Sequence, residues 1–492
     1  MTRFSRLMVV AAAAGLGASP ISAQLLGGGG GPLGGAVGGL LGGVTNPIGG
    51  AVGGLTSGGA DGGAVGGLTN TVGRISNNTT NSVLGGPGSL LGSVPGALSG
   101  SVSRNMVSDY FWPASLNQIS IPPEISSAPP QAIADYRLAR YRALVDANRN
   151  TLDLDPDGQP VRKRELISTD PDGRSLALAI RSGFRVIGDE RDAELGIRLV
   201  TLAIPKGMNI RQAMTAIRKA APGLQVDFNH IYEPSGGALL AAAGARLAAA
   251  PAVRGRTRLA MIDGGVASHP SLARASIEQR GFAGEAQPTG HGTAVGSLLV
   301  GDQGPFRGAA RGAQLFVGDV YGGNPAAGSV STILRALSWA ASRNPAVINI
   351  SLVGPSNHAL ARAIAALRGR GIHIVAAVGN DGPAAPPQYP ASYPGVVSVT
   401  AVDAGGRALP EAGRAAHLDF AAPGADMIAA LPGKGYAIVR GTSFAAPYAS
   451  ARLALTGSYQ RLAMEARPGK GKVGRGIVCY ECRVDPKAVR GR

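Results

Sequence analysis

The sequence predicts an α/β fold built on a parallel sheet flanked by helices, preceded by a small α+β domain and a Gly-rich N-terminal region. From Arg258 to Val402, continuous apolar runs alternate with helical patterns. Such runs are typical of strands that are buried on both faces of a parallel sheet. Residues 162–232 instead mix short strand patterns with a capped helix, and residues 24–105 repeat Gly-Gly-Leu and Gly-Gly-Ala-Val motifs.

Residues 1–23 are typical of a signal peptide. Arg3 and Arg6 form a basic start, Leu7–Ala18 is apolar, and Ala23 ends a small-residue cleavage site. The apolar stretch is shorter than the roughly 20 residues that span a bilayer. We therefore expect an exported protein, periplasmic or secreted, without a transmembrane anchor.

The Gly-rich region, residues 24–105, is expected to be disordered. Glycine loses the most backbone entropy on ordering, and this region has few bulky side chains to offset that loss. A spacer or surface-adhesive role is the alternative. The formal net charge is +17, but no aromatic-and-basic recognition motif accompanies it, so we expect no nucleic-acid partner.

Residues 106–161 are predicted to form a helical and linker segment, with a helix at Gln131–Asn150. Residues 162–235 follow as an α+β domain with one amphipathic helix, capped by Asn209 with Gln212 at the capping-box position. Its expected strands are Phe184–Ile187, Ile197–Ile204 and Val226–Tyr232.

Residues 236–256 are predicted to be an exposed linker or processing segment, although an Ala-rich helix at Ala238–Ala250 is equally allowed. The main domain is expected to span 257–478, and a basic tail, 479–492, follows it. The main domain's predicted strands are Arg258–Ile262, Gln314–Val320, Val347–Leu352, Ile372–Val378 and Val396–Val402, with helices at Val330–Arg343 and His358–Arg370.

Four polar residues stand at the ends of these elements: Asp263, His291, Asn380 and Ser443. Asp263 ends an apolar strand, His291 opens a small-residue helix within Gly-His-Gly-Thr, and Asn380 follows another strand. Ser443 lies in Gly-Thr-Ser-Phe-Ala-Ala-Pro, where a strand gives way to a helix. Ligands of α/β sheets gather beyond the carboxyl ends of strands, so these side chains are expected to share one site.

This order of motifs, from about Arg258 to about Val478, resembles the subtilisin-like serine peptidases. The resemblance implies Ser443 as nucleophile, His291 as general base and Asp263 as the group that orients it. Asn380 would donate its side-chain N–H to the oxyanion. The implied activity is that of a serine endopeptidase acting on proteins or peptides. A catalytically silent binding or structural protein on the same fold is the alternative.

The resemblance also implies subsites and a propeptide. Residues 162–235 resemble a propeptide domain, which would act as an intramolecular inhibitor and be removed by self-processing. The predicted substrate-binding residues form two stretches, Ser351, Leu352, Val353 and Gly354 in a strand that pairs with substrate, and Ala377, Val378 and Gly379 in a pocket wall. The wall is small and uncharged, so no charge selection is expected for the residue before the cut.

The chain departs from the family pattern at Gly264, Val353 and Arg311, which stand in place of Ser or Thr, Gly and Pro. No Asp-rich calcium loop is visible. Calcium is common in the family but is not predicted here, and no cofactor or metal is expected to be required. Cys479 and Cys482 are expected to form a local disulfide, with reduced or metal-bound states as alternatives.

Overall fold

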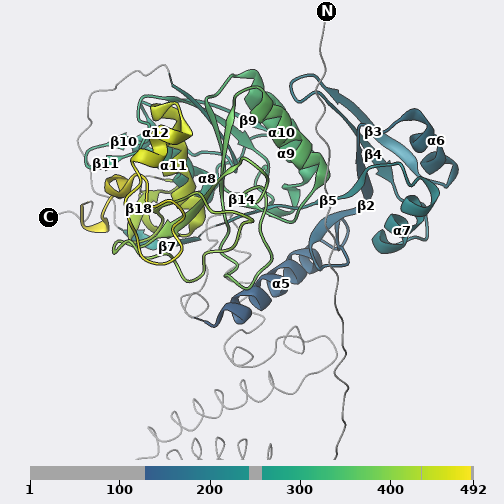
Figure 1. Cartoon of the computed structure of the whole chain (residues 1–492), viewed down its shortest axis with the longest axis horizontal. Helices are drawn as coiled ribbons and strands as arrows, with labels where there is room; N and C mark the ends of the chain where they lie inside the picture. Colours follow the sequence, from purple (N-terminus) through teal and green to yellow (C-terminus); the bar gives the residue numbers. More distant parts are fainter. Residues whose placement is uncertain (1–127, 236, 243–256, 434, 489–492) are drawn as a thin grey trace, which may run out of the picture. The chain divides into compact units, whose positions relative to one another are not determined.

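The computed structural model describes residues 128–235, 237–242, 257–433 and 435–488 (Figure 1). The expected signal peptide, the Gly-rich region and most of the predicted 236–256 linker lie outside the described residues. Within the described residues, no helix combines the length and apolarity needed to cross a membrane.

The first described element is helix α5 (Pro130–Ala147), close to its expected position. It is followed by a sheet in the order β1-β2-β4-β3, with β5 paired to β2. Every pairing in this sheet is antiparallel. The strands are β1 (Leu152–Leu154), β2 (Pro160–Thr169), β3 (Arg185–Asp192), β4 (Ile197–Ala203) and β5 (Val226–His230).

Two helices, α6 (Gly173–Arg181) and α7 (Ile210–Ala220), accompany this sheet. The expected capping box of α7 is present, because Asn209 accepts from the backbone of Gln212 while the Gln212 side chain accepts from Asn209. The prediction of a single helix was wrong. Helix α6 was missed because it has only nine residues and begins at a glycine, which is a poor helix former.

The two faces of the small sheet pack against different partners. Leu166 lies in a core with residues of α7, whereas the next residue, Ile167, packs in a core with α9 (Val330–Ser342) and α10 (His358–Gly369). Alternation along a strand sends successive side chains to opposite faces. The small sheet is therefore packed between the helices of its own domain and those of the main domain.

The main domain contains a seven-stranded sheet in the order β17-β16-β15-β13-β8-β12-β9. All its pairings are parallel, as predicted. The strands are β8 (Arg258–Asp263), β9 (Ser276–Gly281), β12 (Gln314–Asp319), β13 (Val347–Ile350), β15 (His373–Ala377), β16 (Val397–Val402) and β17 (Phe420–Pro423).

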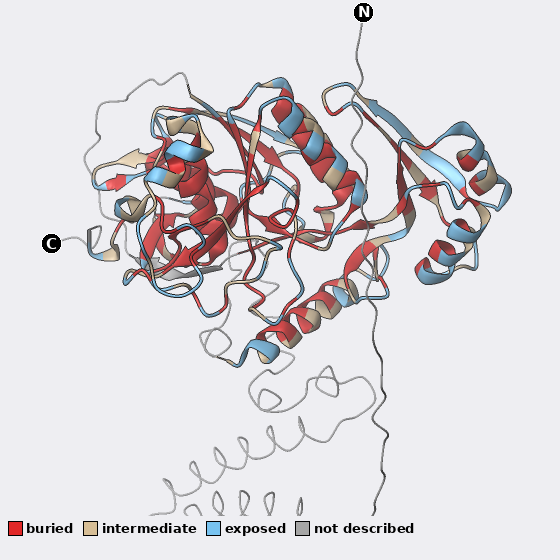
Figure 2. Ribbon diagram, in the orientation of Figure 1, coloured by how far each residue is buried: buried red, intermediate tan, exposed pale blue. Residues whose placement is uncertain are grey.

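Helices cover both faces of this sheet, and its strands are mostly buried except the edge strand β9, most of whose residues are exposed (Figure 2). Helices α9 and α10 pack in one core, and α8 (Gly290–Val300) and α11 (Thr442–Thr456) pack in the other. A short helix, α12 (Tyr459–Met464), follows α11, and η2 (Pro270–Leu272), η3 (Pro325–Ala327), η4 (Tyr480–Cys482) and η5 (Pro486–Ala488) are single 3-10 turns.

Three small antiparallel sheets complete the fold. The pair β10 (Asp302–Gln303) with β11 (Phe306–Arg307) is local. The other two join segments far apart in sequence: β6 (Glu233–Pro234) with β14 (Leu352–Val353), and β7 (Gly237–Ala242) with β19 (Tyr436–Arg440), which also pairs with β18 (Met427–Ala430). The alternative of a helix from Ala238 is thus wrong at its start, because this backbone pairs with β19.

The C-terminal segment packs onto the main domain. Cys479 and Cys482 form a disulfide at η4. Beyond it, Val484 is buried in the core shared with α8 and α11, and its carbonyl accepts from Ile428 N at 3.1 Å.

Candidate active site

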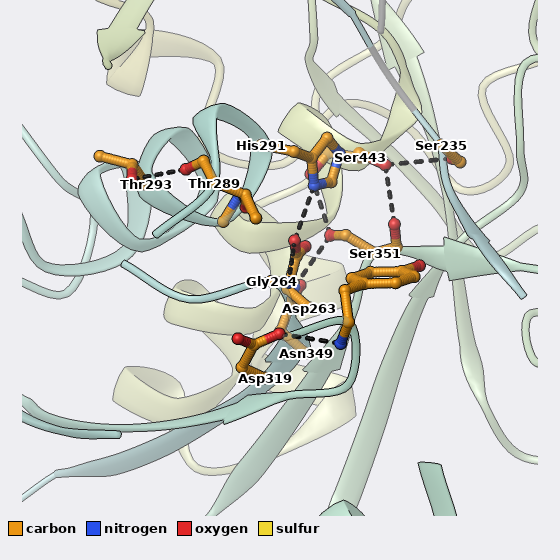
Figure 3. A network of polar contacts seen from close by, with 12 residues as sticks. Ser235, Asp263, Gly264, Thr289, His291, Thr293, Asp319, Asn349, Ser351 and Ser443 are labelled. Atoms are coloured by element: carbon orange, nitrogen blue, oxygen red, sulfur yellow. Dashed lines mark hydrogen bonds and ion pairs between the residues drawn. The ribbon is translucent and has the colours of Figure 1, made fainter. Parts of the chain in front are cut away.

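Strand β8 ends at Asp263, whose carboxylate is fully buried. Its Oδ1 lies 2.8 Å from Nδ1 of His291 and accepts from Gly264 N at 2.7 Å (Figure 3). Among the residues that the structure describes, Oδ2 has no hydrogen-bond partner. The carboxylate therefore fixes one ring nitrogen of the imidazole.

His291 is positioned by the start of α8. Thr289 is the N-cap and accepts from Gly292 N at 2.9 Å, so the helix begins directly before the histidine. The His291 ring lies 5.4 Å from the ring of Phe444, the residue after Ser443. Its Nε2 is buried and has no hydrogen-bond partner in the described part of the chain. The ring thus packs against Phe444 of α11 and keeps one nitrogen without a described partner.

Close packing against Thr289 explains why a glycine, Gly264, follows Asp263. A Cβ at Gly264 would lie 2.3 Å from Oγ1 of Thr289, so the threonine occupies the space that a side chain would need. A Cβ at Gly292 would lie 2.2 Å from the carbonyl oxygen of Gly264. The departure at Gly264 therefore allows the turn after β8 to approach the first turn of α8 closely.

Ser443 is fully buried near the start of α11, following Gly441 with φ of 137°. Its Oγ lies 3.0 Å from the carbonyl oxygen of Ser351 and 3.1 Å from Oγ of Ser235. Its backbone N–H donates to the carbonyl oxygen of Ser235 at 3.0 Å. The described contacts include no hydrogen bond between Ser443 Oγ and His291, although Figure 3 shows the two side chains beside each other.

Asn380 is hydrogen-bonded to the start of α11, next to Ser443. Its Oδ1 accepts from Thr442 N at 3.0 Å, while its buried Nδ2 has no partner among described residues. Thr442 Oγ1 also contacts both the N–H and the carbonyl of Gly379, each at 3.1 Å. Thr442 is thus a positioning residue that was not predicted from the sequence, although its place beside Ser443 offered a signal.

The predicted substrate-binding strand is paired with the chain's own segment. Leu352 and Val353 in β14 lie opposite Pro234 and Glu233 in antiparallel register. Ser235 N donates to the carbonyl oxygen of Ser351 at 3.2 Å. The 233–235 segment is therefore held as a peptide in extended conformation, with its last carbonyl against Ser443.

Tyr232 continues this segment between two loops. Its N–H donates to Gly328 O at 2.8 Å, and a Cβ at Gly354 would lie 2.8 Å from its ring. The ring is fully buried, and its hydroxyl contacts the carbonyl of Pro355. Gly354 therefore forms part of a site for a large aromatic side chain.

The predicted pocket wall lies at the end of β15. Ala377 and Val378 are buried, and Val378 N donates to Val399 O in β16 at 3.1 Å. Gly379, with φ of 90°, accepts from Gly413 N at 2.7 Å. These residues connect the sheet to Asn380.

Past Ser235, the chain resumes pairing along β19, the strand that leads into Ser443. Gly237 lies opposite Arg440 and Ala238 opposite Val439. The chain's own backbone therefore runs through the site on both sides of the peptide bond after Ser235. No sequence signal predicted this second pairing, because β-pairing of distant segments depends on the folded geometry.

A buried charge cluster was also missed. Arg140 of α5 contacts Glu233 and lies 3.4 Å from Oδ1 of Asp381, while Arg137 Nε lies 4.0 Å from Oδ2 of the same carboxylate. Burial raises the pKa of Glu233 to about 7. The charges of Arg140 and Arg137 lower this pKa, whereas the nearby charge of Asp381 raises it further. Asp381 directly follows Asn380, so the cluster adjoins the predicted oxyanion donor.

The site combines a buried carboxylate, an imidazole, an amide and a serine at the carboxyl edge of a parallel α/β sheet. This combination defines the class of the protein as a hydrolase with a serine nucleophile. The model of the subtilase family matches residues 255–467. Subtilisin Savinase of Lederbergia lenta is 34% identical over 204 residues, which are 40% of this chain and 75% of that protein. The chain belongs to the subtilase family and is a subtilisin-type serine endopeptidase.

Other similarities agree with this assignment. The major intracellular serine protease of Bacillus subtilis (strain 168) is 31% identical over 242 residues, covering 46% of this chain and 76% of that protein. An alkaline protease of Shouchella clausii is 34% identical over 204 residues, but these make up only 53% of its length. The crystal structure of fervidolysin from Fervidobacterium pennivorans has the same fold, with a TM-score of 0.55, 19% identity, and coverage of 70% of this chain and 63% of that one.

Proposed function

We propose that the chain is an exported precursor that cuts its own Ser235–Gly236 bond through Ser443, His291 and Asp263. The carrying observation is the position of the Ser235 carbonyl, which accepts the backbone N–H of Ser443 at 3.0 Å. The same residue donates to Ser351 O, and pairing with β14 and β19 brackets the bond on both sides. These contacts support residues 162–235 as a propeptide that occupies the site as a substrate would.

In this mechanism, the Ser443 hydroxyl leaves Ser351 O and Ser235 Oγ by rotation about its Cα–Cβ bond and donates to Nε2 of His291. Nε2 takes the proton as Oγ attacks the Ser235 carbonyl carbon. Asp263 Oδ1 stabilises the resulting imidazolium through Nδ1, at the 2.8 Å contact already present.

The developing oxyanion would be stabilised by two donors. Ser443 N already donates to the Ser235 carbonyl, and Asn380 Nδ2 is buried without a partner in the described part of the chain. Fixed donors aimed at a developing charge stabilise the transition state more than the ground state. His291 then returns the proton to the leaving amine of Gly236, and water hydrolyses the acyl-enzyme by the same route in reverse.

The test compares the full chain with Ser443→Ala and Ser450→Ala. Ser450 is buried on the same helix and donates to Asn349 Oδ1, so its substitution is the matched control for a lost helix serine. We expect the wild type and Ser450→Ala to yield a product beginning at Gly236 and to react with a fluorophosphonate probe. Ser443→Ala should stay uncut and unlabelled. A folded wild type that neither cuts nor labels would instead support a catalytically silent protein.

Export is proposed from the basic, apolar and small-residue pattern of residues 1–23. N-terminal sequencing of the uncut Ser443→Ala chain after expression in a host with a secretory pathway tests it. The expected first residue is Gln24 in the exported fraction. A chain that keeps Met1 and stays inside the host would contradict export without bearing on catalysis.

A further inference from the structure

Four charged side chains meet beside the active site in nearly complete burial. Arg137, Arg140, Glu233 and Asp381 are exposed by only 5%, 8%, 6% and 4%. The Arg140 guanidinium lies between the two carboxylates, in contact with Glu233 and 3.4 Å from Asp381. Buried charges are retained only when they are paired, so each carboxylate depends on these arginines.

The members of this cluster come from opposite sides of the Ser235–Gly236 bond. Both arginines lie on α5, and Glu233 lies in β6, so all three precede the bond. Asp381 belongs to the main domain and directly follows Asn380. Cleavage and release of the N-terminal part would therefore remove both arginines with which Asp381 pairs in this structure.

An unpaired carboxylate would then face the place vacated by the segment. Removing one partner of a buried ion pair is costly, because the remaining charge loses its counter-charge. A cation supplied by the next peptide to bind would restore the pairing. Such a peptide would follow the same β14 edge as Glu233 and Pro234.

The register identifies which side chain can supply this cation. Ser235 directly precedes the bond, and Glu233 is the third residue before it. The Glu233 carboxylate is separated from Asp381 by one guanidinium group, that of Arg140. A lysine or arginine in place of Glu233 would need no intermediary, because its own cation could occupy the position of that guanidinium.

We propose that Asp381 is a specificity-determining residue that selects lysine or arginine at the third residue before the cut in substrates of the mature enzyme. This inference rests on the proposed function. In the precursor, helix α5 supplies the cation that a substrate would supply itself. The uncharged wall formed by Ala377, Val378 and Gly379 concerns the residue next to the cut and is unaffected.

The test uses matured enzyme and internally quenched peptides that contain Tyr-X-Pro-Ser-Gly-Gly, with X as Arg, Gln or Glu. We expect kcat/KM for the Arg peptide to exceed that for the Gln peptide by about 5-fold or more at low ionic strength, and the Glu peptide to be the poorest. Asp381→Asn should reduce the Arg-to-Gln ratio to about 2 or less. Asp381→Glu keeps the charge and should keep the preference.

Two controls locate the effect. Glu465→Gln removes one negative charge from a pair with Arg452 on the main domain, and should leave the ratio unchanged. A second peptide set carries Arg in place of Tyr, one position farther from the cut, and should show no dependence on Asp381. Cleavage of the Gln peptide by Asp381→Asn at a rate within about 2-fold of wild type would show that the catalytic machinery is intact.

The inference would be overturned if the Arg-to-Gln ratio of kcat/KM were the same in wild type and Asp381→Asn. It would also be overturned if Asp381 determined a preference for arginine in place of Tyr, one position farther from the cut. In either case the Gln peptide is still cut, so the proposed function stands. If matured wild type cuts no peptide and binds no fluorophosphonate probe, the proposed function fails, and the inference fails with it.

Discussion

The backbone N–H of Ser443 donates to the carbonyl oxygen of Ser235, 208 residues earlier in the chain, at 3.0 Å. This hydrogen bond brings the end of the small domain to the start of α11. Together with the Ser235 N–H bond to Ser351, it orients one peptide carbonyl against the serine side chain.

Ser235→Pro should block maturation. Proline lacks the N–H that donates to Ser351 O at 3.2 Å, so the peptide loses one of the two bonds that place its carbonyl. We expect conversion to slow by at least about 10-fold, measured by gel and N-terminal sequencing over time. Ser235→Ala keeps the N–H and removes a hydroxyl that competes for Ser443 Oγ, so it should mature at least as fast as wild type. Equal rates for the proline and wild-type chains would contradict the assigned bond.

Asn380→Asp should lower kcat with little change in KM. The aspartate keeps an oxygen that can accept from Thr442 N, as Asn380 Oδ1 does at 3.0 Å, but it loses the Nδ2 donor, which has no partner among the described residues. The known cost of removing such a donor in a subtilisin is about 10²–10³ in kcat. Peptide kinetics with active-site titration measures kcat of the variant. Thermal unfolding checks whether the contacts of Thr442 are kept. A variant with wild-type kcat would remove Asn380 from the oxyanion site.

Gly264→Ser should destabilise the main domain, although the family resemblance implies Ser or Thr at this position. Its Cβ would lie 2.3 Å from Thr289 Oγ1, so α8 would have to shift and carry His291 with it. We expect a loss of about 1–3 kcal/mol in the free energy of unfolding and reduced activity. Gly369→Ser is the matched control, because a Cβ there meets nothing within 4 Å. Chemical denaturation of both variants in the Ser443→Ala background provides the comparison.

The inhibited precursor should lose stability as the pH rises from about 4.5 to about 7. The pKa of Glu233 is raised from 4.5 to about 7 by burial, so the folded precursor holds a proton that the unfolded chain has released. This contribution is complete below pH 4.5 and is lost as pH rises through 7.

A pair of uncut chains, Ser443→Ala with and without Glu233→Gln, isolates this effect from catalysis. The glutamine does not titrate, so the difference in unfolding free energy between the pair should change by on the order of 1–3 kcal/mol across that range. Thermal or chemical unfolding at several pH values measures it. A constant difference would exclude Glu233 as the titrating group.

Much of the main domain could be predicted from local patterns. The expected strand at Gln314–Val320 is observed as β12, and the helix expected at Val330–Arg343 is α9. Buried parallel strands need continuous apolar side chains, so their positions are recorded in short stretches of sequence. Asp263, His291, Asn380 and Ser443 could be identified from the sequence for a similar reason. Each lies near the end of a strand or the start of a helix, next to small residues.

Tertiary structure alone decided how these groups meet. Only folding shows that Glu233 contacts Arg140, that Thr289 fills the space beside Gly264, and that Ser443 Oγ turns toward Ser351 instead of His291. These contacts join residues 25 to 93 positions apart, and no local periodicity encodes their distance or rotamer. Local sequence patterns were sufficient for the fold class and the chemical groups of the site, because these depend on burial pattern and side-chain type. The peptide bond presented to Ser443 was decided by packing, because the pairings with β14 and β19 fix which residues lie beside this serine.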